Sequence, residues 1–348
     1  MQYILNHTGQ LLISNTANCP IFIPSLLNDN LIASLAICNE TNFKFTPNKH
    51  NLDNVFKLYF SKLLAGNMSL QENIADLAIE NIFLWHDAKI AKNSNVKIQL
   101  NDSKRFIKGL NSFLYCKELT VNQIINFNAI FLPKNIIKGI RKGKMRVGKP
   151  QKVSYAFFAP PIEKIEKLMV DTINFIHSKK THQIDKALIS MMQFFFIHPF
   201  NDGNGRVFRA LTLSLLKDQL GLINSFIMLV YFKIINQENY YLSQKEYRNG
   251  NVNEIKNFHI QAINWTNKSV TVLSDFIDEY MEKIGNDKSN PYFSQVVVIV
   301  DKSEQLDSDL FKLQKTKGQK CIYLNTALLN VLNQFDYYLR FELRSFLL

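Results

Sequence analysis

The residues from Ile197 to Arg209, IHPFNDGNGRVFR, combine side chains suited to acid–base, metal-binding and anion-binding chemistry in one short stretch. His198 carries an imidazole that can exchange a proton near neutral pH, and Asp202 carries a carboxylate suited to a hard divalent cation. Arg206 and Arg209 are three residues apart, so on a helix they share one face. This combination predicts a phosphate-binding site with a base and a metal ligand beside it.

Two helices must position these side chains. Pro199 disfavours a helical conformation of the preceding residue, so His198 is expected where the apolar helix over residues 184–197 ends. The turn NDGNG tolerates left-handed backbone angles, and the helix after it is expected to stop at Gly221. A glycine turn that leads into a helix directs free N–H groups and the positive end of the helix dipole at one spot, which suits a phosphate.

The sequence HPFNDGNGR, followed by two residues and Arg209, resembles the signature HPFx(D/E)GNGRxxR of the Fic (filamentation induced by cAMP) family, and every fixed position matches. The resemblance implies a mainly α fold, in which a Fic-type helical core carries a small β-hairpin flap. It also implies transfer of AMP from ATP to a hydroxyl side chain of a target protein. The alternative is a polar loop between two core helices, with His198 as a helix cap.

The resemblance gives each polar position of the motif a role. His198 would take the proton from the attacking Tyr, Ser or Thr hydroxyl, and Asp202 would hold Mg²⁺. Phe200 is expected to pack beneath the loop and orient it. The nucleotide phosphates would be bound by the amides of the turn and by the two guanidinium groups, at Gly203, Asn204, Gly205, Arg206 and Arg209.

A tyrosine pair further along the chain extends the resemblance. Tyr240 and Tyr241, on a helix expected over about residues 236–247, resemble the family's pair near the nucleotide base. The family often has arginine a few residues earlier, where this chain has Gln237, which leaves the base contacts open.

An acidic residue upstream of the motif resembles the family's inhibitory element. The sequence SLQE has the spacing of a capping box, which predicts a helix over about residues 69–90. Glu80 and Asn81 in that helix match the inhibitory motif (S/T)xxxE(G/N), although Asp76 stands where Ser or Thr is expected. By resemblance Glu80 would pair with Arg209, and the second negative charge at Asp76 could raise the pKa of Glu80 or weaken that pairing. A surface carboxylate at Glu80 is the alternative.

A basic run precedes a predicted hairpin. Residues 138–149 hold six Lys or Arg, and residues 152–157 then alternate with the period of a strand after the turn sequence Gly148-Lys149-Pro150. The hairpin, over about residues 141–158, resembles the family's flap, through which a target protein would dock by strand addition. An ordinary surface hairpin is the alternative.

The chain length of 348 residues is enough for two or three domains. We expect an N-terminal helical region over 1–66, irregular at first, and a Fic domain over 67–270. After a linker, residues 285–348 would form a small α+β or winged-helix-like domain with a β-rich run at 296–300. Helices could start at Asp309 and Thr326, and because no helix-turn-helix pattern is evident, DNA is the lesser of the expected partners.

The formal net charge of +12 favours acidic partners, such as a nucleotide, a nucleic acid or an acidic protein surface, although lysines spread along the chain also suit a solvated surface. The cysteines lack CxxC spacing and indicate reduced thiols, at Cys19, Cys38, Cys116 and Cys321. With neither a signal-like start nor a stretch of about 20 apolar residues, we expect no membrane association and a cytoplasmic location, in a bacterial cytosol or, for a secreted effector, a host cytosol. A homodimer is left open.

Three other functions compete with AMP transfer. Doc-like kinases resemble this motif but replace the second glycine of the turn with lysine, and the glycine at Gly205 therefore favours AMP transfer. Removal of AMP from a modified protein is a second option, because Glu80 could align a water molecule. A nucleotide-sensing regulator that binds DNA or protein through its C-terminal region is a third, against which the complete catalytic set argues.

Overall fold

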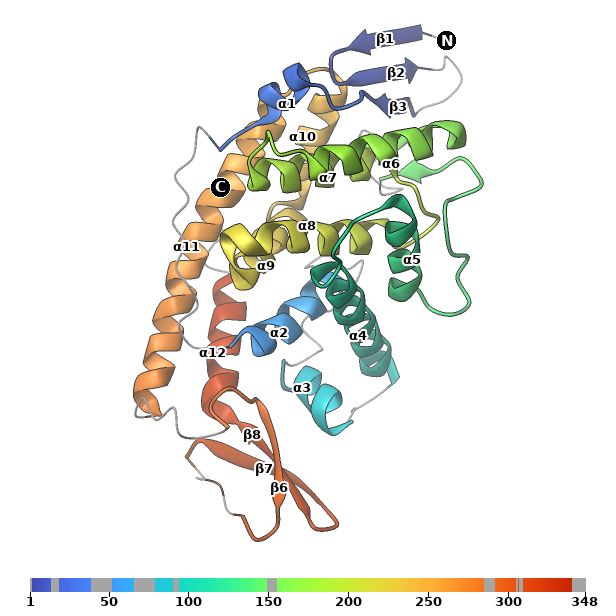
Figure 1. Ribbon diagram of the computed structural model, residues 1–348. Coiled ribbons are helices and arrows are strands. Elements are labelled where there is room, and N and C mark those ends of the chain that lie inside the picture. The colour runs from blue at the N-terminus through green and yellow to red at the C-terminus, as the bar shows by residue number, and fades with distance from the viewer. Residues whose placement is uncertain are drawn as a thin grey trace. The chain divides into compact units, whose positions relative to one another are not determined.

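In a computed structural model the chain is mainly α-helical, as the sequence predicted, and the residues that the structure describes include two small sheets (Figure 1). Residues 2–13, 19–38, 52–65, 79–89, 94–148, 155–284, 292–304, 306 and 309–339 are described. Two compact units are each built from separate stretches of chain. The first unit comprises Met1–Phe43, Lys108–Leu220 and Asn236–Asn264, and the second comprises Lys44–Ile107, Gly221–Ile235 and Trp265–Leu348. The boundaries 1–66, 67–270 and 285–348 stay predictions.

The first unit contains a five-stranded sheet of order β1-β2-β3-β5-β4, in which only the β3–β5 pair is parallel. Its strands are β1 (Gln2–Asn6), β2 (Gly9–Ile13), β3 (Ile21–Pro24), β4 (Arg146–Val147) and β5 (Phe157–Phe158). The β4–β5 pair confirms a hairpin in the predicted flap region; residues 149–154 of the flap lie outside the described residues.

The expectation of an irregular N-terminus is wrong for residues 2–13, which form the β1–β2 hairpin. Asn6 Oδ1 accepts hydrogen bonds from the Thr8 and Gly9 amides at 3.0 and 3.1 Å, and this side chain closes the tight turn. A Cβ on Gly9 would lie 2.4 Å from the Ile23 oxygen of β3, so the position requires glycine. The turn was missed because His7-Thr8 lacks the Asn-Gly or Asp-Gly sequence typical of two-residue hairpin loops.

Helices build the rest of the first unit. The helices wholly inside it are α1 (Asp29–Leu35), α5 (Val121–Phe131), α6 (Ile162–His177), α7 (Gln183–Ile197), α8 (Asn204–Leu220) and α10 (Gln237–Arg248). Both α4 (Ser94–Leu114) and α11 (Asn253–Lys283) continue past the unit boundaries. Local signals explain the starts: Asn28 Oδ1 accepts from the Leu31 amide at 2.9 Å, and Thr120 forms a capping box with Gln123.

The predicted central position of α7 is confirmed, because nearly all of its side chains are buried. It packs between α6 and α8, and its apolar side chains join an aromatic cluster with residues of β3, β5 and α10. In that cluster Phe196 stacks on Tyr247 with a centroid separation of 5.3 Å and meets Phe22 edge-on at 4.9 Å. Burial on all sides fixes α7, so the loop at its C-terminal end starts from a rigid support.

The second unit holds the C-terminal sheet, of order β6-β8-β7, and further helices. Its elements are α2 (Asp53–Ala65), α3 (Ile79–Ala88), α9 (Leu222–Val230), η3 (Tyr231–Ile235), β6 (Val297–Asp301), β7 (Phe311–Lys317), β8 (Lys320–Asn325) and α12 (Thr326–Tyr337). The predicted α+β character, the strand near 296–300 and the helix start at Thr326 are confirmed. A helix start at Asp309 is wrong: this residue lies in a turn before β7. No helix among the described residues could span a bilayer.

Candidate active site

His198 is held in an uncommon backbone conformation at the end of α7. Its φ of 45° and ψ of 60° are left-handed, and its N–H still donates to the Phe194 oxygen at 3.0 Å. Few non-glycine residues adopt a positive φ, so the surrounding contacts must stabilise this conformation. The prediction that Pro199 ends the helix at His198 is confirmed, and the imidazole leaves the helix where the polar loop begins.

The imidazole of His198 is in its neutral form, with one ring nitrogen as donor and the other as acceptor. Nδ1 lies 3.3 Å from the Phe195 carbonyl oxygen, which can only accept, so Nδ1 carries the proton and Nε2 is left with a free lone pair. Burial lowers the pKa of His198 to about 4, the Phe195 hydrogen bond opposes this shift, and the positive charge of Arg141 adds to it. At neutral pH the side chain is therefore uncharged.

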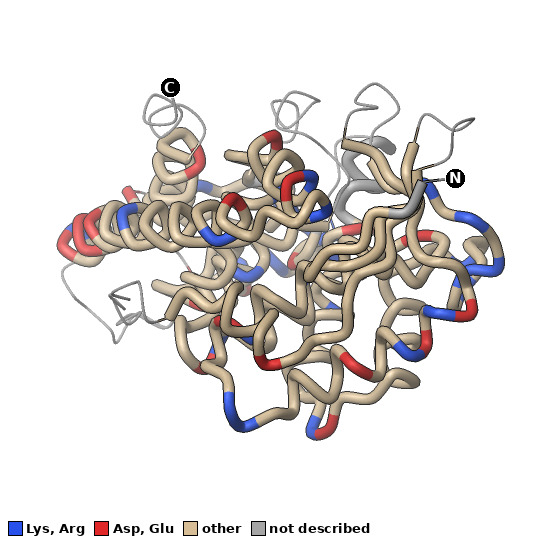
Figure 2. The backbone as a smooth tube through the Cα atoms, turned by 90° about the horizontal axis from the view of Figure 1, so that it is seen from above, with Lys and Arg blue, Asp and Glu red and all other residues tan. Residues whose placement is uncertain are grey.

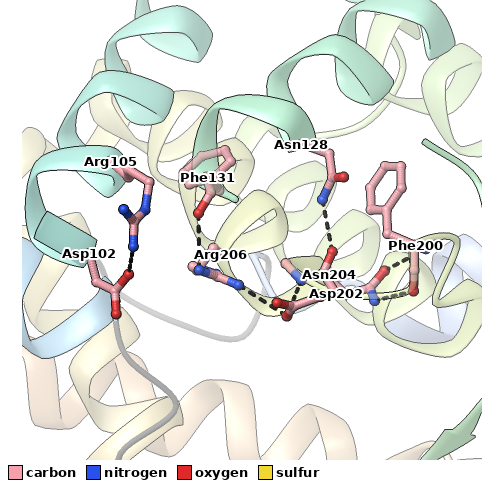
Figure 3. Close-up of polar contacts among 9 residues, drawn as sticks. Asp102, Arg105, Asn128, Phe131, Phe200, Asp202, Asn204 and Arg206 are labelled. Atoms are coloured by element: carbon pink, nitrogen blue, oxygen red, sulfur yellow. Dashed lines mark hydrogen bonds and ion pairs between the residues drawn. The ribbon is translucent and has the colours of Figure 1, made fainter. Parts of the chain in front are cut away.

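The loop after His198 is locked by its own side chains (Figure 3). Asn204 Oδ1 accepts from the Phe200 amide at 3.0 Å, and Asn204 Nδ2 donates to the Phe200 oxygen at 2.8 Å. The Phe200 side chain is fully buried, as expected of a residue that packs beneath the loop. Asn128 Nδ2, from α5, donates to the backbone carbonyl oxygen of Asp202 at 3.0 Å. At Gly203, φ is +83° and a Cβ would lie 2.7 Å from Asn128 Nδ2, so both conformation and space require glycine.

Asp202 and Arg206 form an ion pair at the start of α8 (Figure 3). Asp202 Oδ1 accepts from the Gly203 amide at 2.5 Å and from an Arg206 nitrogen at 3.0 Å. A second Arg206 nitrogen donates to the Phe131 oxygen at 3.0 Å, and the guanidinium is largely buried. Arg206 thus fastens α8 to α5 and orients Asp202, while its predicted contact to phosphate stays a prediction.

The first turn of α8 offers backbone donors beside a second guanidinium. The first intrahelical-type bond runs from the Val207 amide to the Gly203 oxygen at 3.0 Å, and the amides of Asn204, Gly205 and Arg206 have no acceptor among the described residues. Gly205 is exposed, and a Cβ there would lie 2.8 Å from an Arg209 nitrogen, so the Arg209 guanidinium lies against this turn. Burial, and then the charge of Arg206, lower the pKa of Arg209 to about 10. Two like charges beside free amides favour an anion.

Both tyrosines of the predicted pair lie close to the Phe195 ring, which in turn lies close to the His198 ring. The Phe195 ring centroid is 6.2 Å from that of Tyr240, 6.5 Å from that of Tyr241 and 6.5 Å from that of His198. Burial raises the pKa of Tyr240, and the neighbouring Tyr241 adds to this shift. The helix α10 thus brings both tyrosines to the site; their contacts to a nucleotide base stay predictions.

Arg141 is a site residue that the sequence analysis placed only in a basic surface run. It is 1% exposed, and its guanidinium donates to the carbonyl oxygens of His198 at 2.9 Å, of Gly143 at 2.8 Å and of Pro160. Its own amide donates to the Pro199 oxygen at 2.9 Å. Arg141 therefore links Gly143 and Pro160, which lie near the two ends of the flap region, to His198. The signal available in the sequence was its chemistry, because the planar guanidinium of arginine, with five donors in a rigid fork, suits several carbonyls at once better than the ammonium of the neighbouring lysines.

Two further residues of the site had weaker signals. Asn128 is a buried polar residue on the same face of α5 as Ile124 and Phe131, and such a residue needs hydrogen-bond partners. Phe195 is partly exposed on an otherwise buried helix, and only the path of α10 shows which rings it meets.

Glu80, the residue predicted to inhibit, belongs to the second unit. Glu80 lies in the first turn of α3 in the second unit, while Asp76 and the SLQE capping box lie outside the described residues. The pairing of Glu80 with Arg209 stays a prediction.

The metal-binding capacity of the site rests on Asp202. Its side chain is 44% exposed, and Oδ2 accepts no hydrogen bond from the residues that the structure describes. The described part of the chain contains no group of three His, Cys, Asp or Glu residues that could hold a metal ion. One free carboxylate oxygen fits Mg²⁺, which is commonly held by one or two carboxylates together with phosphate and water oxygens.

Comparisons with known proteins agree with this geometry. Residues 118–216 match the model of the Fic/DOC family. Over 200 residues the chain is 27% identical to the probable protein adenylyltransferase aq_aa38 of Aquifex aeolicus (strain VF5), a match that covers 53% of this chain and about half, 56%, of that protein. The crystal structure of a Fic family protein from Desulfovibrio desulfuricans G20 shares the fold, with a TM-score of 0.53 and 15% identity over 86% of this chain and 97% of that one. Residues 118–216 of this chain therefore form a domain of the Fic/DOC family.

Proposed function

We propose that this chain is a protein adenylyltransferase, which transfers AMP from ATP to a hydroxyl side chain of a target protein. The observation that carries the proposal is the open first turn of α8, where the exposed Gly205 leaves backbone amides accessible beside the Arg209 guanidinium. Lysine at this position, as in Doc-like kinases, would bring a bulky cation against Arg209. The name of the Aquifex relative supports the same reaction.

The reaction follows from the arrangement of donors and base. The hydroxyl oxygen of the target attacks the α-phosphorus, a new O–P bond forms, and the bond from that phosphorus to the oxygen leading to the β-phosphate breaks. Pyrophosphate leaves, and Nε2 of His198 takes the hydroxyl proton. Phosphoryl-type transfer depends mainly on positioning and charge neutralisation, and the α8 amides and Arg209 can supply both to the phosphates.

The low pKa of His198 suits a site that is completed by its substrate. A pKa of about 4 makes the imidazole a weak base, although it is in the required neutral form. Negative phosphates nearby favour the protonated form and so raise the pKa toward neutrality. His198 would then be the stronger base only when ATP is bound, which limits unproductive proton transfer.

Mg²⁺ would be held by the free oxygen of Asp202 together with phosphate oxygens. When bound, the ion would offset the charge of the phosphates and that of the leaving pyrophosphate. Within the protein, Arg206 and the Gly203 amide hold the other oxygen of Asp202 and so fix the orientation of the carboxylate.

Glu80 is proposed as the inhibitor of this reaction, by pairing with Arg209 and keeping that guanidinium from the γ-phosphate. The match of Glu80-Asn81 to the inhibitory motif supports this role.

The test uses ATP labelled in turn at the α- and the γ-phosphate, with Mg²⁺ and a cell lysate as the source of target proteins. AMP transfer puts the α-label, and no γ-label, on the chain itself or on a target, and His198→Ala should abolish it. Transfer of the γ-label would show a kinase and overturn the proposal. ATP binding without any transfer, also by Glu80→Gly, would indicate a nucleotide sensor, and release of AMP from a modified target would indicate the removal activity.

A further inference from the structure

In the loop between α5 and β4, residues 133–145, the exposed charged side chains are all lysines, and in the sequence they flank one exposed apolar side chain. Ile137 is 71% exposed, and the four lysines around it in the sequence are also exposed. The basic loop surface is defined by Lys134, Ile137, Lys138, Lys142 and Lys144. An exposed aliphatic side chain among cations matches the usual anatomy of a protein-binding patch, with an apolar centre and a polar rim.

All charged residues in a long stretch of sequence around this loop are positive. Residues 119–162 contain eight Lys or Arg and no Asp or Glu, so they contribute +8 to the formal net charge of +12. The rest of the chain carries 33 Lys or Arg (41 less these eight) against all 29 Asp or Glu, so there the two signs nearly balance. Figure 2 marks both kinds of charge along the described backbone. Solvated surfaces ordinarily mix both signs, whereas a block of like charges indicates an interaction surface.

The basic loop surface is fastened to the loop that carries His198. Ile140 forms a β-bridge with Phe200, and the neighbouring Arg141 amide donates to the Pro199 oxygen at 2.9 Å. The buried Arg141 guanidinium also bonds the His198 and Gly143 oxygens. The loop is therefore ordered before any partner binds, which lowers the entropic cost of docking, and a partner lying on it is brought next to the imidazole.

We propose that the basic loop surface docks an acidic segment of the target protein, with an apolar side chain of that segment against Ile137. The proposal rests on the proposed function, which requires a protein target at this loop, and it adds the chemical character of that target. Lysines and an aliphatic side chain suit carboxylates and an apolar contact, whereas single-stranded nucleic acids are bound mainly by aromatic stacking, and no aromatic residue belongs to this surface. ATP has a separate set of donors at the start of α8.

The test measures binding by fluorescence anisotropy, without ATP. The probes are a fluorescein-labelled twelve-residue peptide with six glutamates, one leucine and one tyrosine, the same peptide with glutamine in place of glutamate, and a twelve-nucleotide oligothymidine. The surface variant is Lys138→Glu/Lys142→Glu/Lys144→Glu. The matched control is Lys164→Glu/Lys167→Glu/Lys180→Glu, which changes the charge equally at exposed lysines of α6 and the turn after it in the same unit. Circular dichroism checks that both variants are folded.

The glutamate peptide should bind the unaltered chain at least tenfold more tightly than the glutamine peptide. The surface variant should lose about tenfold or more of that affinity, since three favourable charges become repulsive, while the control loses less than threefold. Ile137→Ser should weaken binding of the glutamate peptide severalfold and leave that of the oligothymidine unchanged. Equal losses in both triple variants, tighter binding of the oligothymidine than of the peptide, or no peptide binding at all would each overturn the proposal. Because these measurements need no transfer, a chain that binds the peptide but never transfers AMP would refute the proposed function and leave this surface standing.

Discussion

At the scale of single residues, the candidate site contains two groups of side chains. One group is proposed to act on the substrates, and the other holds the loop in its conformation. His198 and Arg209 are proposed to act on the target and the nucleotide, while Asn204 and Arg206 are engaged with the loop and its support. Burial gives each acting group an unusual proton affinity: the pKa is about 4 for His198 and about 10 for Arg209. The first three predictions belong to this scale.

His198→Ala should leave ATP binding largely intact and reduce AMP transfer by about 10²-fold or more, the usual effect of losing a general base. The measurement is the rate of α-label transfer at saturating ATP, with the nucleotide dissociation constant determined separately. Labelling at the unaltered rate would show that another group takes the proton.

Asp202→Ala should lower both the rate and its dependence on Mg²⁺, because the free carboxylate oxygen is lost. The experiment is a Mg²⁺ titration of the transfer rate for both proteins. Asp202→Asn is the matched variant, since it keeps an acceptor toward Arg206 and removes only the charge. Superimposable titration curves would exclude Asp202 as the metal ligand.

Arg141→Lys should lower kcat several-fold more than it alters KM for ATP, because the compact ammonium of lysine does not reproduce the wide planar fork that bonds all three carbonyls and so holds His198 less firmly. Arg141→Met should lower kcat further, and because the Arg141 charge depresses the pKa of His198, the acidic limb of the pH–rate profile should move to higher pH.

Arg248→Met is the control for Arg141, since Arg248 is equally buried near the flap but bonds Tyr155 and lies over the Phe157 ring at 4.7 Å. Equal kcat losses in the Arg141 and Arg248 variants, with no pH shift, would show that both arginines only stabilise the fold.

At the scale of elements, two helices and the turn between them form the support of the site. The helix α7 is buried on nearly all sides and cannot shift without repacking, and α8 presents its N-terminal amides directly after the turn. We expect a third helix, α3, to inhibit AMP transfer, because it carries Glu80 at its start.

Glu80→Gly should increase labelling about tenfold or more, since a charge-assisted contact of Arg209 to phosphate contributes on the order of 1.5–3 kcal/mol. Arg209→Ala should be inactive with or without Glu80, because both effects pass through the same guanidinium. The four proteins of this double-mutant cycle are compared at fixed ATP and Mg²⁺, with folding checked by circular dichroism. A rate in Glu80→Gly at or below that of the unaltered chain would remove Glu80 as an inhibitor.

At the scale of the whole molecule, a buried histidine outside the site links stability to pH. His259 of α11 is 2% exposed, and burial lowers its pKa from 6.5 to about 3. Below pH 6.5 the unfolded chain takes up a proton that the folded chain refuses, so this contribution to stability is complete above pH 6.5 and is lost as the pH falls toward 3.

Acidification from pH 7 to pH 5 should therefore destabilise the first unit by about 2 kcal/mol through His259. Thermal unfolding followed by circular dichroism at pH 7, 6 and 5 measures the effect. His259→Gln should show a smaller decrease of Tm over this range, and the exposed His177→Gln should match the unaltered chain. The same slope in all three proteins would mean that other groups cause the acid sensitivity.

The sequence by itself determined which residues make up the candidate site, because the groups proposed to act lie within a single turn and the helix that follows it. Spacing along the chain suffices there: Pro199 ends one helix, the glycines allow the turn, and the two arginines recur at one face of α8. Periodicity likewise predicted the helices, and it failed for the β1–β2 hairpin, whose turn sequence is atypical.

Only the tertiary structure decided what holds and surrounds those groups. The bond from Arg141 to His198 spans 57 residues and that from Asn128 to Asp202 spans 74, and no local pattern specifies such pairings. Burial of Arg141 among carbonyls turned one cation of a basic run into a support of the site, while its neighbouring lysines stayed exposed. The physical reason is that proton affinity, orientation and exposure depend on which distant elements remove a side chain from water, and that is settled when α5, α7, α8 and the flap region pack together.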